Sequence, residues 1–194
     1  MFDSLLSGVN SFDASVMSFV QERLHHPFTD AVFPYVTYLA ELGLIWAILA
    51  LVLFIRRKSR FTGFSAICAM LLGLVLGQFL LKSVIARPRP FQQFPDLVTL
   101  LISPPSGSSF PSGHTCASFA AAVAILLRDR RWGIPSLVLA CLIGFSRVFL
   151  FVHWPTDVLA GAVLGVACAL LMHFLLPRLT KNVKFLHPEA SSAA

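Results

Sequence analysis

The sequence predicts an all-α fold, an integral membrane bundle of five transmembrane helices with an amphipathic segment before the first. Composition is the first observation: 57% of the 194 residues are hydrophobic and 12% are charged, with a mean hydropathy of +0.80, far more apolar than a water-soluble domain requires. The second is that apolar residues gather in long runs, and the third is that basic residues gather between those runs. We expect one membrane-embedded domain over residues 1–180 and a cytoplasmic tail over residues 181–194.

The apolar runs predict the five spans, because most are close to the ~20 residues that cross a bilayer as an α-helix. They cover residues 30–55, 61–81, 114–127, 133–152 and 157–176. The third run has about 14 residues, or ~21 Å of helix, against a hydrocarbon core of ~30 Å. Its outer end is therefore expected to lie below the membrane surface.

Residues 1–29 lack the basic start and the uninterrupted apolar stretch of a signal peptide. Charged residues interrupt this segment, namely Asp3, Asp13, Glu22 and Arg23. Because burying these charges in lipid would be costly, we interpret the segment as an amphipathic helix at the membrane interface. A sixth, shorter span in this segment is the alternative.

Basic residues between the runs predict the orientation in the plasma membrane. They form three clusters: Arg56, Arg57, Lys58 and Arg60; Arg128, Arg130 and Arg131; Arg178, Lys181 and Lys184. The positive-inside rule makes all three clusters cytoplasmic, which places the amino terminus outside and the carboxyl terminus inside. The net charge of +6 therefore indicates membrane loops and argues against nucleic acid as a partner.

A second group of polar residues lies at the outer ends of the predicted spans, where the positive-inside rule does not account for it. It comprises Lys82, Arg87, Arg89, His114, Arg147, His153 and Asp157. Arg147 lies in an otherwise apolar stretch, where a central arginine costs roughly 2.5–3.5 kcal/mol. Because alternate spans run in opposite directions, all of these side chains are expected at one face of the bundle.

This set is typical of phosphoryl transfer, whose transition state spreads negative charge over several oxygens. Lys82, Arg89 and Arg147 can bind those oxygens, the arginines through two parallel hydrogen bonds. The turn Pro111-Ser-Gly-His114 leads into a helix, whose free N–H groups favour an anion. Ser112 can cap that helix or bind phosphate.

The two histidines can divide the chemistry between them. Asp157 follows His153 at i+4, where it can accept the ring N–H, fix the tautomer and leave the other nitrogen free to attack phosphorus. His114 is then the general acid, and the base that activates water in the second step. Pro155 disfavours helix at Trp154, so the pair is expected to straddle a helix start.

No metal or other cofactor is expected. The sequence shows no Asp/Glu/His cluster at metal-ligand spacing, and three fixed cations can replace a divalent ion. The four cysteines stand singly in apolar runs, at Cys68, Cys116, Cys141 and Cys168, so we interpret them as small core residues.

Three motifs of the outer group resemble, without a gap, the signature of the type 2 phosphatidic acid phosphatase family. They are Lys82-x6-Arg89-Pro90, Pro111-Ser-Gly-His114 and Ser146-Arg147-x5-His153-x3-Asp157. The resemblance implies a metal-independent membrane lipid phosphatase in which His153 is the nucleophile, Asp157 its partner and His114 the acid. The phosphate-binding residues it implies are Lys82, Arg89, Ser112, Gly113 and Arg147. Many membrane members have six spans, and this chain departs from them in its predicted five.

Several questions stay open at this stage. The substrate can be phosphatidic acid, phosphatidylglycerol phosphate, undecaprenyl diphosphate or phosphorylated lipid A, and the chain can be a monomer or a homodimer. A vanadium-dependent haloperoxidase uses a similar constellation, but the membrane spans argue against it. A non-enzymatic anion or lipid transporter would explain the cations but not the histidine–aspartate pair. Glu41, inside the first run, can be a partner of an active-site cation or a neutral structural residue.

Overall fold

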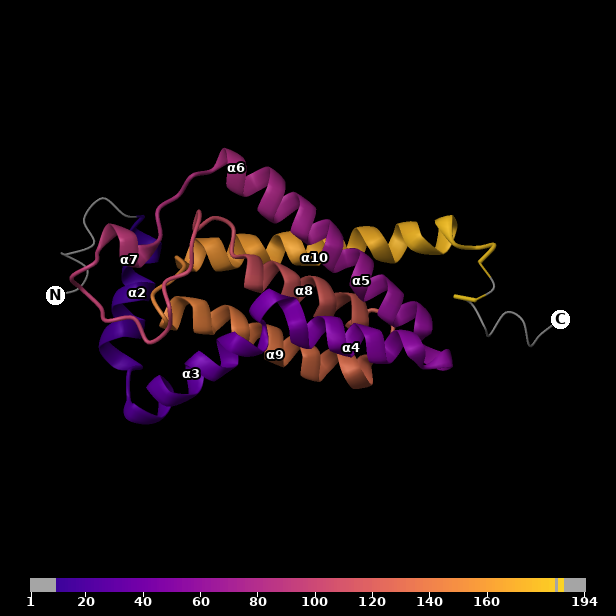
Figure 1. The fold of residues 1–194 in the computed structure, drawn as a ribbon, viewed down its shortest axis with the longest axis horizontal. Helices are drawn as coiled ribbons and strands as arrows, with labels where there is room; N and C mark the ends of the chain where they lie inside the picture. The colour runs from indigo at the N-terminus through magenta and orange to yellow at the C-terminus, as the bar shows by residue number, and fades with distance from the viewer. Residues whose placement is uncertain (1–9, 184, 187–194) are drawn as a thin grey trace.

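The computed structural model is a bundle of helices that lie side by side along the length of the molecule (Figure 1). It describes residues 10–183 and 185–186, and over these residues all regular secondary structure is helical. The short helix α8 (Gly113–Leu126) is the central element, because it packs against α10 (Pro155–Leu179), α9 (Arg130–Phe149) and α5 (Arg60–Leu74). The predicted all-α membrane bundle is confirmed.

Helices long and apolar enough to cross a membrane correspond to the predicted runs. Within the described residues they are Arg57–Val84, Arg130–Phe149 and Pro155–Leu179. The 14 residues of α8 are apolar but shorter, as the sequence predicted. Predicted and observed ends differ by a few residues, which is the usual scatter at helix termini. The count of five spans, with α8 as one of them, stays a prediction.

The first predicted span is not one straight helix, so the expectation of a single helix over 30–55 is wrong. α3 (Pro27–Leu39) ends before a short turn η1 (Glu41–Gly43), and α4 (Leu44–Ile55) continues at an angle of 43°. Leu42 and Gly43 both have positive φ, 51° and 70°. This left-handed backbone interrupts the helical ladder, and glycine adopts it without steric cost.

The second predicted span changes its helical type near its outer end. α5 passes into a π-helical segment, η3 (Val75–Leu81), and then into one turn of α-helix, α6 (Lys82–Val84). π-Helical segments are frequent at functional sites, because the extra residue in the turn reorients the side chains that follow. In this chain, Lys82 follows directly after the π-helical segment.

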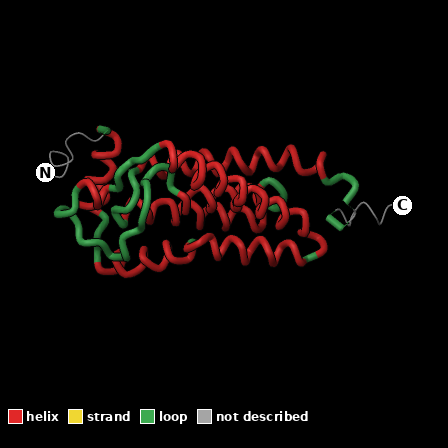
Figure 2. The backbone as a smooth tube through the Cα atoms, turned by 45° about the horizontal axis from the view of Figure 1, so that its top comes forward, coloured by secondary structure: helices red, strands yellow, loops and turns green. Residues whose placement is uncertain are grey.

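The loops of the bundle gather at one end, together with the first described helix (Figure 2). α2 (Ser11–Arg23) packs there against α9 and α10, and α7 (Pro90–Gln93) lies within the long connection between α6 and α8. Met17 and Val20 of α2 join Phe149 and Trp154 in a buried cluster. Residues 1–9 lie outside the described residues, and the interfacial position of segment 1–29 stays a prediction.

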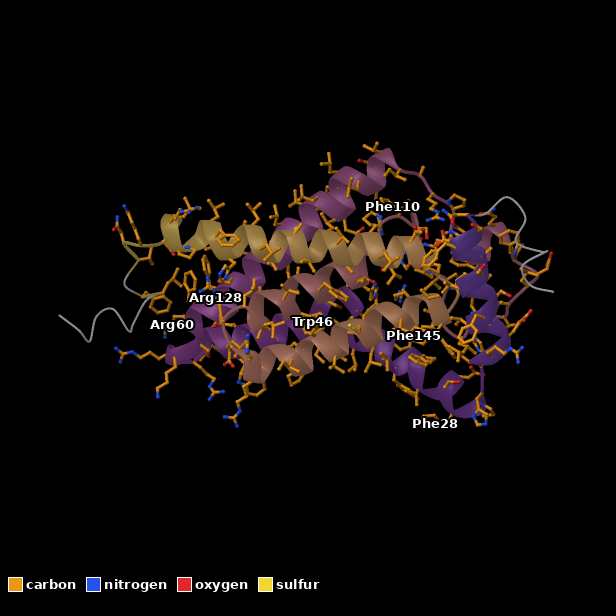
Figure 3. All side chains as sticks on the ribbon, turned by 180° about the vertical axis from the view of Figure 1, so that it is seen from behind. Phe28, Trp46, Arg60, Phe110, Arg128 and Phe145 are labelled. Atoms are coloured by element: carbon orange, nitrogen blue, oxygen red, sulfur yellow. The ribbon has the colours of Figure 1, made fainter. Side chains whose placement is uncertain are left out.

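Basic side chains mark the opposite end of the bundle. Arg60 and Arg128 lie far from Phe28 and Phe110, which belong to the end where the loops gather (Figure 3). Arg128 stacks over the ring of Phe61, with its guanidinium carbon 4.2 Å from the ring centroid. These two arginines lie at the end that the predicted orientation places in the cytoplasm, and the orientation itself stays a prediction.

Small residues allow α8 and α10 to approach closely. A Cβ atom at Gly161 would lie 2.6 Å from the Ser112 carbonyl oxygen, and one at Gly165 would lie 2.4 Å from that of Cys116. The Gly161-x3-Gly165 spacing therefore works as a packing surface inside the bundle. This contact fixes the start of α8 against the start of α10.

Candidate active site

The predicted site residues surround one cavity of about 770 Å³. Six of the eight line it: Lys82, Arg89, Gly113, His114, Arg147 and His153. Ser112 and Asp157 lie directly behind it and are fully buried. Residues that are 75 positions apart in the sequence thus meet at the loop-rich end of the bundle.

The start of α8 forms one wall of the cavity. Ser112 is the N-cap residue, and its Oγ accepts a hydrogen bond from the Thr115 N–H at 3.5 Å. Its own N–H donates to the Asp157 carbonyl at 3.0 Å, which joins α8 to α10. The next residue, Gly113, opens the helix, and His114 lies in its first turn. An anion in the cavity would meet the positive end of this helix dipole.

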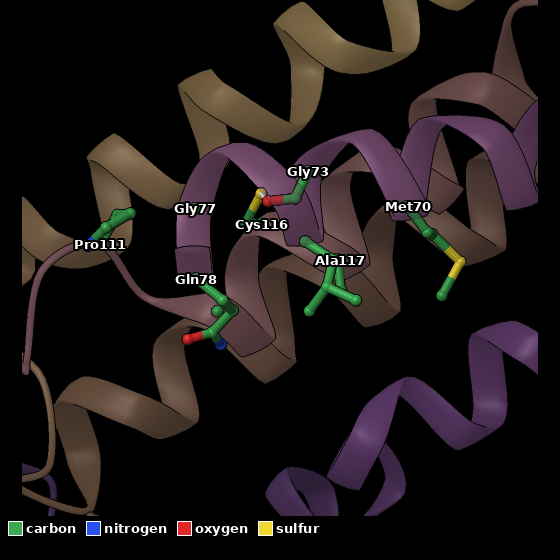
Figure 4. A pocket seen from close by; sticks show the side chains of 9 residues that line it. Met70, Gly73, Gly77, Gln78, Pro111, Cys116 and Ala117 are labelled. Carbon is green, nitrogen blue, oxygen red and sulfur yellow. Dashed lines mark hydrogen bonds between the residues drawn. The ribbon is translucent and has the colours of Figure 1, made fainter. Parts of the chain in front are cut away.

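Gly113 is closely covered by η3. A Cβ atom at this position would lie 2.3 Å from the Gln78 Nε2, so a larger residue would displace the Gln78 side chain. Gln78 also lines a second cavity, of about 40 Å³, where Gly73 and Gly77 face Cys116 and Pro111 (Figure 4). The reoriented turn of η3 therefore packs directly on the loop that leads into α8.

Arg147 comes from the last turn of α9 and is 2% exposed. Its Nη1 donates to the Thr37 Oγ1 of α3 at 2.5 Å. Its backbone carbonyl accepts from the N–H groups of Val152 and His153, both at 3.2 Å. Arg147 thus aims a cation into the cavity and also closes the turn that carries His153.

His153 lies in the short connection between α9 and α10, and α10 begins at Pro155, as predicted. Its Nε2 is 3.0 Å from the Arg89 Nη1. Because arginine can only donate, Nε2 must be the acceptor and Nδ1 must carry the proton. Complete burial, reinforced by the charges of Arg147 and Arg89, lowers the pKa of His153 to about 3. The ring is therefore neutral at pH 7.

The Nδ1 side of His153 faces Asp157. Nδ1 is 3.7 Å from the Asp157 Oδ2 and 3.4 Å from the Ser109 Oγ. Ser109 in turn donates a short hydrogen bond to the same Oδ2, which also accepts from the Trp154 N–H at 2.9 Å. The expected aspartate is in place, with Ser109 beside the direct path between it and the histidine.

Arg89 has two functions at the site. Its guanidinium donates to the carbonyls of Ser106, Gly107 and Val152 at 2.9 to 3.0 Å, which ties two loops together. Burial lowers its pKa to about 10, so it remains a cation at pH 7. It both anchors the loops and presents positive charge beside the His153 ring.

Glu41 lies at the mouth of the same cavity, on the turn that breaks the first span. Its Oε2 is 3.6 Å from the His114 Nε2, and its side chain is 57% exposed. The neighbour of Glu41 is therefore the second histidine. The sequence had left a cation partner and a neutral structural role as equal possibilities.

Sequence reasoning gave no supporting role at the site to Asp13, Thr37 or Ser109, and it did not predict the contacts that Arg87 makes there. Each makes its contact with a residue at least 48 positions away, so no local spacing could have indicated it. Over residues 10–183 and 185–186, no three His, Cys, Asp or Glu side chains come together as a metal site would require. All four cysteines are unpaired.

The fold and the site together define an all-helical, multi-pass membrane protein with three cations and two histidines around one cavity. The model of the PAP2 superfamily matches residues 62–181. The chain therefore belongs to the PAP2 superfamily.

Individual relatives agree with this assignment. The chain is 33% identical over 147 residues to undecaprenyl-diphosphatase BcrC of Bacillus subtilis, covering 76% of this chain and 75% of the relative. It is 36% identical over 122 residues to an undecaprenyl-diphosphatase of Sulfolobus acidocaldarius, covering 62% of this chain but 58% of that protein. A third relative, from Bacillus licheniformis, is named bacitracin transport permease protein BcrC and is 36% identical over 150 residues, covering 76% of this chain and 73% of the relative.

Solved structures give the same fold. LpxE of Aquifex aeolicus superposes with a TM-score of 0.73 at 29% identity, covering 86% of this chain and 97% of that one. A transmembrane PAP2-type phosphatidylglycerolphosphate phosphatase from Bacillus subtilis superposes with a TM-score of 0.68 at 24% identity, covering 91% of each chain.

Proposed function

We propose that the chain is a membrane phosphatase that removes the terminal phosphate of a lipid phosphate or diphosphate through a phosphohistidine on His153. The observation that carries this proposal is the environment of the His153 ring. Its Nε2 accepts a hydrogen bond from the Arg89 guanidinium, which lines the cavity together with the ring, and its Nδ1 proton faces a buried carboxylate. A neutral imidazole held in this tautomer is the form that can attack phosphorus.

The first step would transfer the phosphoryl group to the protein. The His153 Nε2 forms a bond to phosphorus while the bond from phosphorus to the leaving oxygen breaks, and His114 donates its proton to that oxygen. Lys82, Arg89 and Arg147 bind the phosphoryl oxygens, together with the Gly113 N–H at the start of the helix that Ser112 caps. The products are the dephosphorylated lipid and the phosphohistidine.

The second step would restore the enzyme. His114, now neutral, takes a proton from water as the water oxygen bonds to phosphorus and the bond from Nε2 to phosphorus breaks. Inorganic phosphate leaves, and His114 is again protonated. The three fixed cations supply the positive charge throughout, so the proposal requires no metal.

The cavity supports a lipid as the substrate because its two sides differ in polarity. The cations and histidines line one side, whereas Ala47, Ile67, Met70, Leu71 and Leu74 line the other. Leu71 and Leu74 are 55% and 47% exposed on a helix that can cross the membrane, so the apolar side opens toward lipid. A phosphate at the polar side would place an attached hydrocarbon chain along α4 and α5.

Among lipid phosphates, a polyprenyl diphosphate such as undecaprenyl diphosphate is the substrate that the relatives favour. Two relatives carry this activity in their names. Phosphatidic acid, phosphatidylglycerol phosphate and phosphorylated lipid A also present a terminal phosphate and remain the competing substrates. The basic end of the bundle supports a plasma-membrane protein whose site faces the extracytoplasmic side.

The test is phosphate release from a panel of these lipids by detergent-purified protein in excess chelator, with His153→Ala as the comparison. We expect chelator-resistant release that falls by at least about 1,000-fold in the variant, and the panel ranks the substrates. Loss of release on adding chelator would contradict the metal-free mechanism. No release from any lipid would favour transport, the function in the name of the Bacillus licheniformis relative.

A further inference from the structure

Arg87 joins two buried carboxylates that come from opposite ends of the chain. Its Nη2 is 2.6 Å from the Asp13 Oδ2, and its Nη1 is 2.7 Å from the Asp157 Oδ1. Both carboxylates are completely buried, whereas the Arg87 side chain is 26% exposed. Two buried negative charges this close to one another need a shared cation, because each alone would be costly.

Asp13 also holds the start of α10. Its Oδ1 accepts from the Thr156 N–H at 2.8 Å, and its Oδ2 accepts from the Thr156 Oγ1 at 2.7 Å. Arg87 Nη1 donates to the same hydroxyl at 2.7 Å. Asp13 therefore bonds both to Arg87 and to the residue that precedes Asp157, so α2 is linked to the site through two routes.

The bond from Arg87 determines which way the Asp157 carboxylate faces. With Oδ1 held by Arg87, Oδ2 is left for Ser109, the Trp154 N–H and the His153 ring. The Arg87 carbonyl also accepts from the Ser109 N–H at 2.9 Å, so one residue orients both neighbours of the histidine. Charge-assisted bonds of this kind are the strong ones in a buried network.

We propose that Arg87 and Asp13 are positioning residues for the His153–Asp157 pair, which makes α2 a working part of the active site. The inference rests on the proposed function, since it assigns a task only if His153 is the nucleophile. α2 lies before residues 62–181, the region that the superfamily model matches. The alternative is that the ion pairs merely attach α2 to the bundle.

The experiment measures kcat, KM and thermal stability of Asp13→Asn, Arg87→Ala, Arg87→Lys and the double variant Asp13→Asn/Arg87→Ala in one detergent. The control is Asp30→Asn, which removes the carboxylate from the 2.7 Å hydrogen bond between Asp30 and the His25 Nδ1 near the same end of the bundle. We expect Arg87→Ala to lower kcat by about 10- to 100-fold and KM to change by less than about threefold. Arg87→Lys should retain part of the kcat that Arg87→Ala loses, because lysine keeps the positive charge but lacks the two parallel N–H donors of the guanidinium.

The double variant distinguishes a role in positioning the His153–Asp157 pair from a role in attaching α2 to the bundle. If Asp13 acts through Arg87, the double variant should lose no more of kcat than Arg87→Ala does alone. The inference is overturned if kcat of Asp13→Asn and Arg87→Lys stays within about twofold of wild type, or if Asp30→Asn loses as much kcat for the same fall in stability. Wild-type release that depends on His153 is required first, so a failure of the proposed function would be recognised separately.

Discussion

The two ring nitrogens of His153 have different partners, and this difference fixes how the residue responds to protons. Arg89 donates to Nε2, and the Nδ1 proton points toward Asp157 and Ser109. Protonating Nε2 would place a new positive charge against a buried arginine. The arrangement that would prepare the ring for attack on phosphorus in the proposed mechanism therefore also resists its protonation.

The stability of the protein should depend on pH through His153. Its pKa is about 3 in the folded protein against an ordinary value of 6.5, so between these values the unfolded chain binds the proton and the folded chain does not. The free energy of unfolding must therefore fall as the pH falls from 6.5 toward 3, by at most about 1.4 kcal/mol per unit from this group. Thermal unfolding in detergent at pH 7 and pH 4.5 measures it.

The matched variant for that measurement is His153→Gln, which cannot take up the proton. Its thermal stability should fall less than that of wild type over the same pH range. An equal fall in thermal stability in the two proteins would show that His153 binds its proton as readily in the folded protein as in the unfolded chain, so that its pKa is not lowered.

The site residues that could be predicted are those whose presence in a span is itself costly. Arg147 could be singled out because an arginine in an apolar run requires a reason, and His153 because Asp157 follows it at a fixed spacing. Asp13 and Ser109 carried no such signal. Asp13 was grouped with the charges of an interfacial segment, but it is completely buried against Arg87 and Thr156, since tertiary contacts provided it with partners.

At the scale of the elements, helix lengths followed from the lengths of the apolar runs, but the break in the first span did not. Residues 30–55 read as one apolar run around Glu41, and nothing in that run requires a turn. The turn arises where Leu42 and Gly43 adopt positive φ, and it brings Glu41 to the cavity. The short α8 could be predicted, because the length of an apolar run translates directly into helix length.

The close contact between α8 and α10 makes Gly165 a sensitive position. A Cβ atom there would meet backbone atoms, the Cys116 carbonyl oxygen at 2.4 Å and the Ala120 nitrogen at 2.8 Å. We expect Gly165→Ala to destabilise the bundle by about 1–3 kcal/mol and to reduce activity, since α8 carries His114. Thermal unfolding and phosphate release measure the two effects.

Gly73→Ala is the control for that prediction. Its Cβ atom would meet the Cys116 Sγ at 3.0 Å, a side-chain atom that can rotate away. It should therefore cost less stability than Gly165→Ala. The reverse order would mean that the two helices separate easily and that their contact does not hold the site.

At the scale of the whole molecule, the catalytic cavity and two arginines of the predicted cytoplasmic clusters lie at opposite ends. The cavity is at the end where the loops gather, and Arg60 and Arg128 mark the other end. One orientation in the membrane satisfies both the positive-inside rule and a site that faces outward. The composition alone indicated a membrane protein. That the three motifs meet at one end could be predicted only from the alternating direction of successive spans.

Labelling in intact cells tests this orientation. We expect a membrane-impermeant maleimide to react with a cysteine placed at Gln93, in α7 at the loop-rich end, and not with one placed at Lys58, both of which are exposed. The unchanged protein, with its own four cysteines, measures background labelling. Labelling at position 58 without labelling at position 93 would reverse the topology and place the site in the cytoplasm.

Two exposed leucines of α5 line the cavity, and this has a kinetic consequence for a substrate that reaches the site from lipid. A substrate that arrives through lipid is never dissolved in bulk water, so its encounter rate is set within a two-dimensional phase. In mixed micelles, the velocity should follow the mole fraction of substrate in the detergent and stay constant when micelles of fixed composition are added at saturating amounts. The velocity with a soluble phosphate ester should instead depend on its concentration in solution. Comparing the two dependences would show whether the substrate reaches the cavity from the membrane or from water.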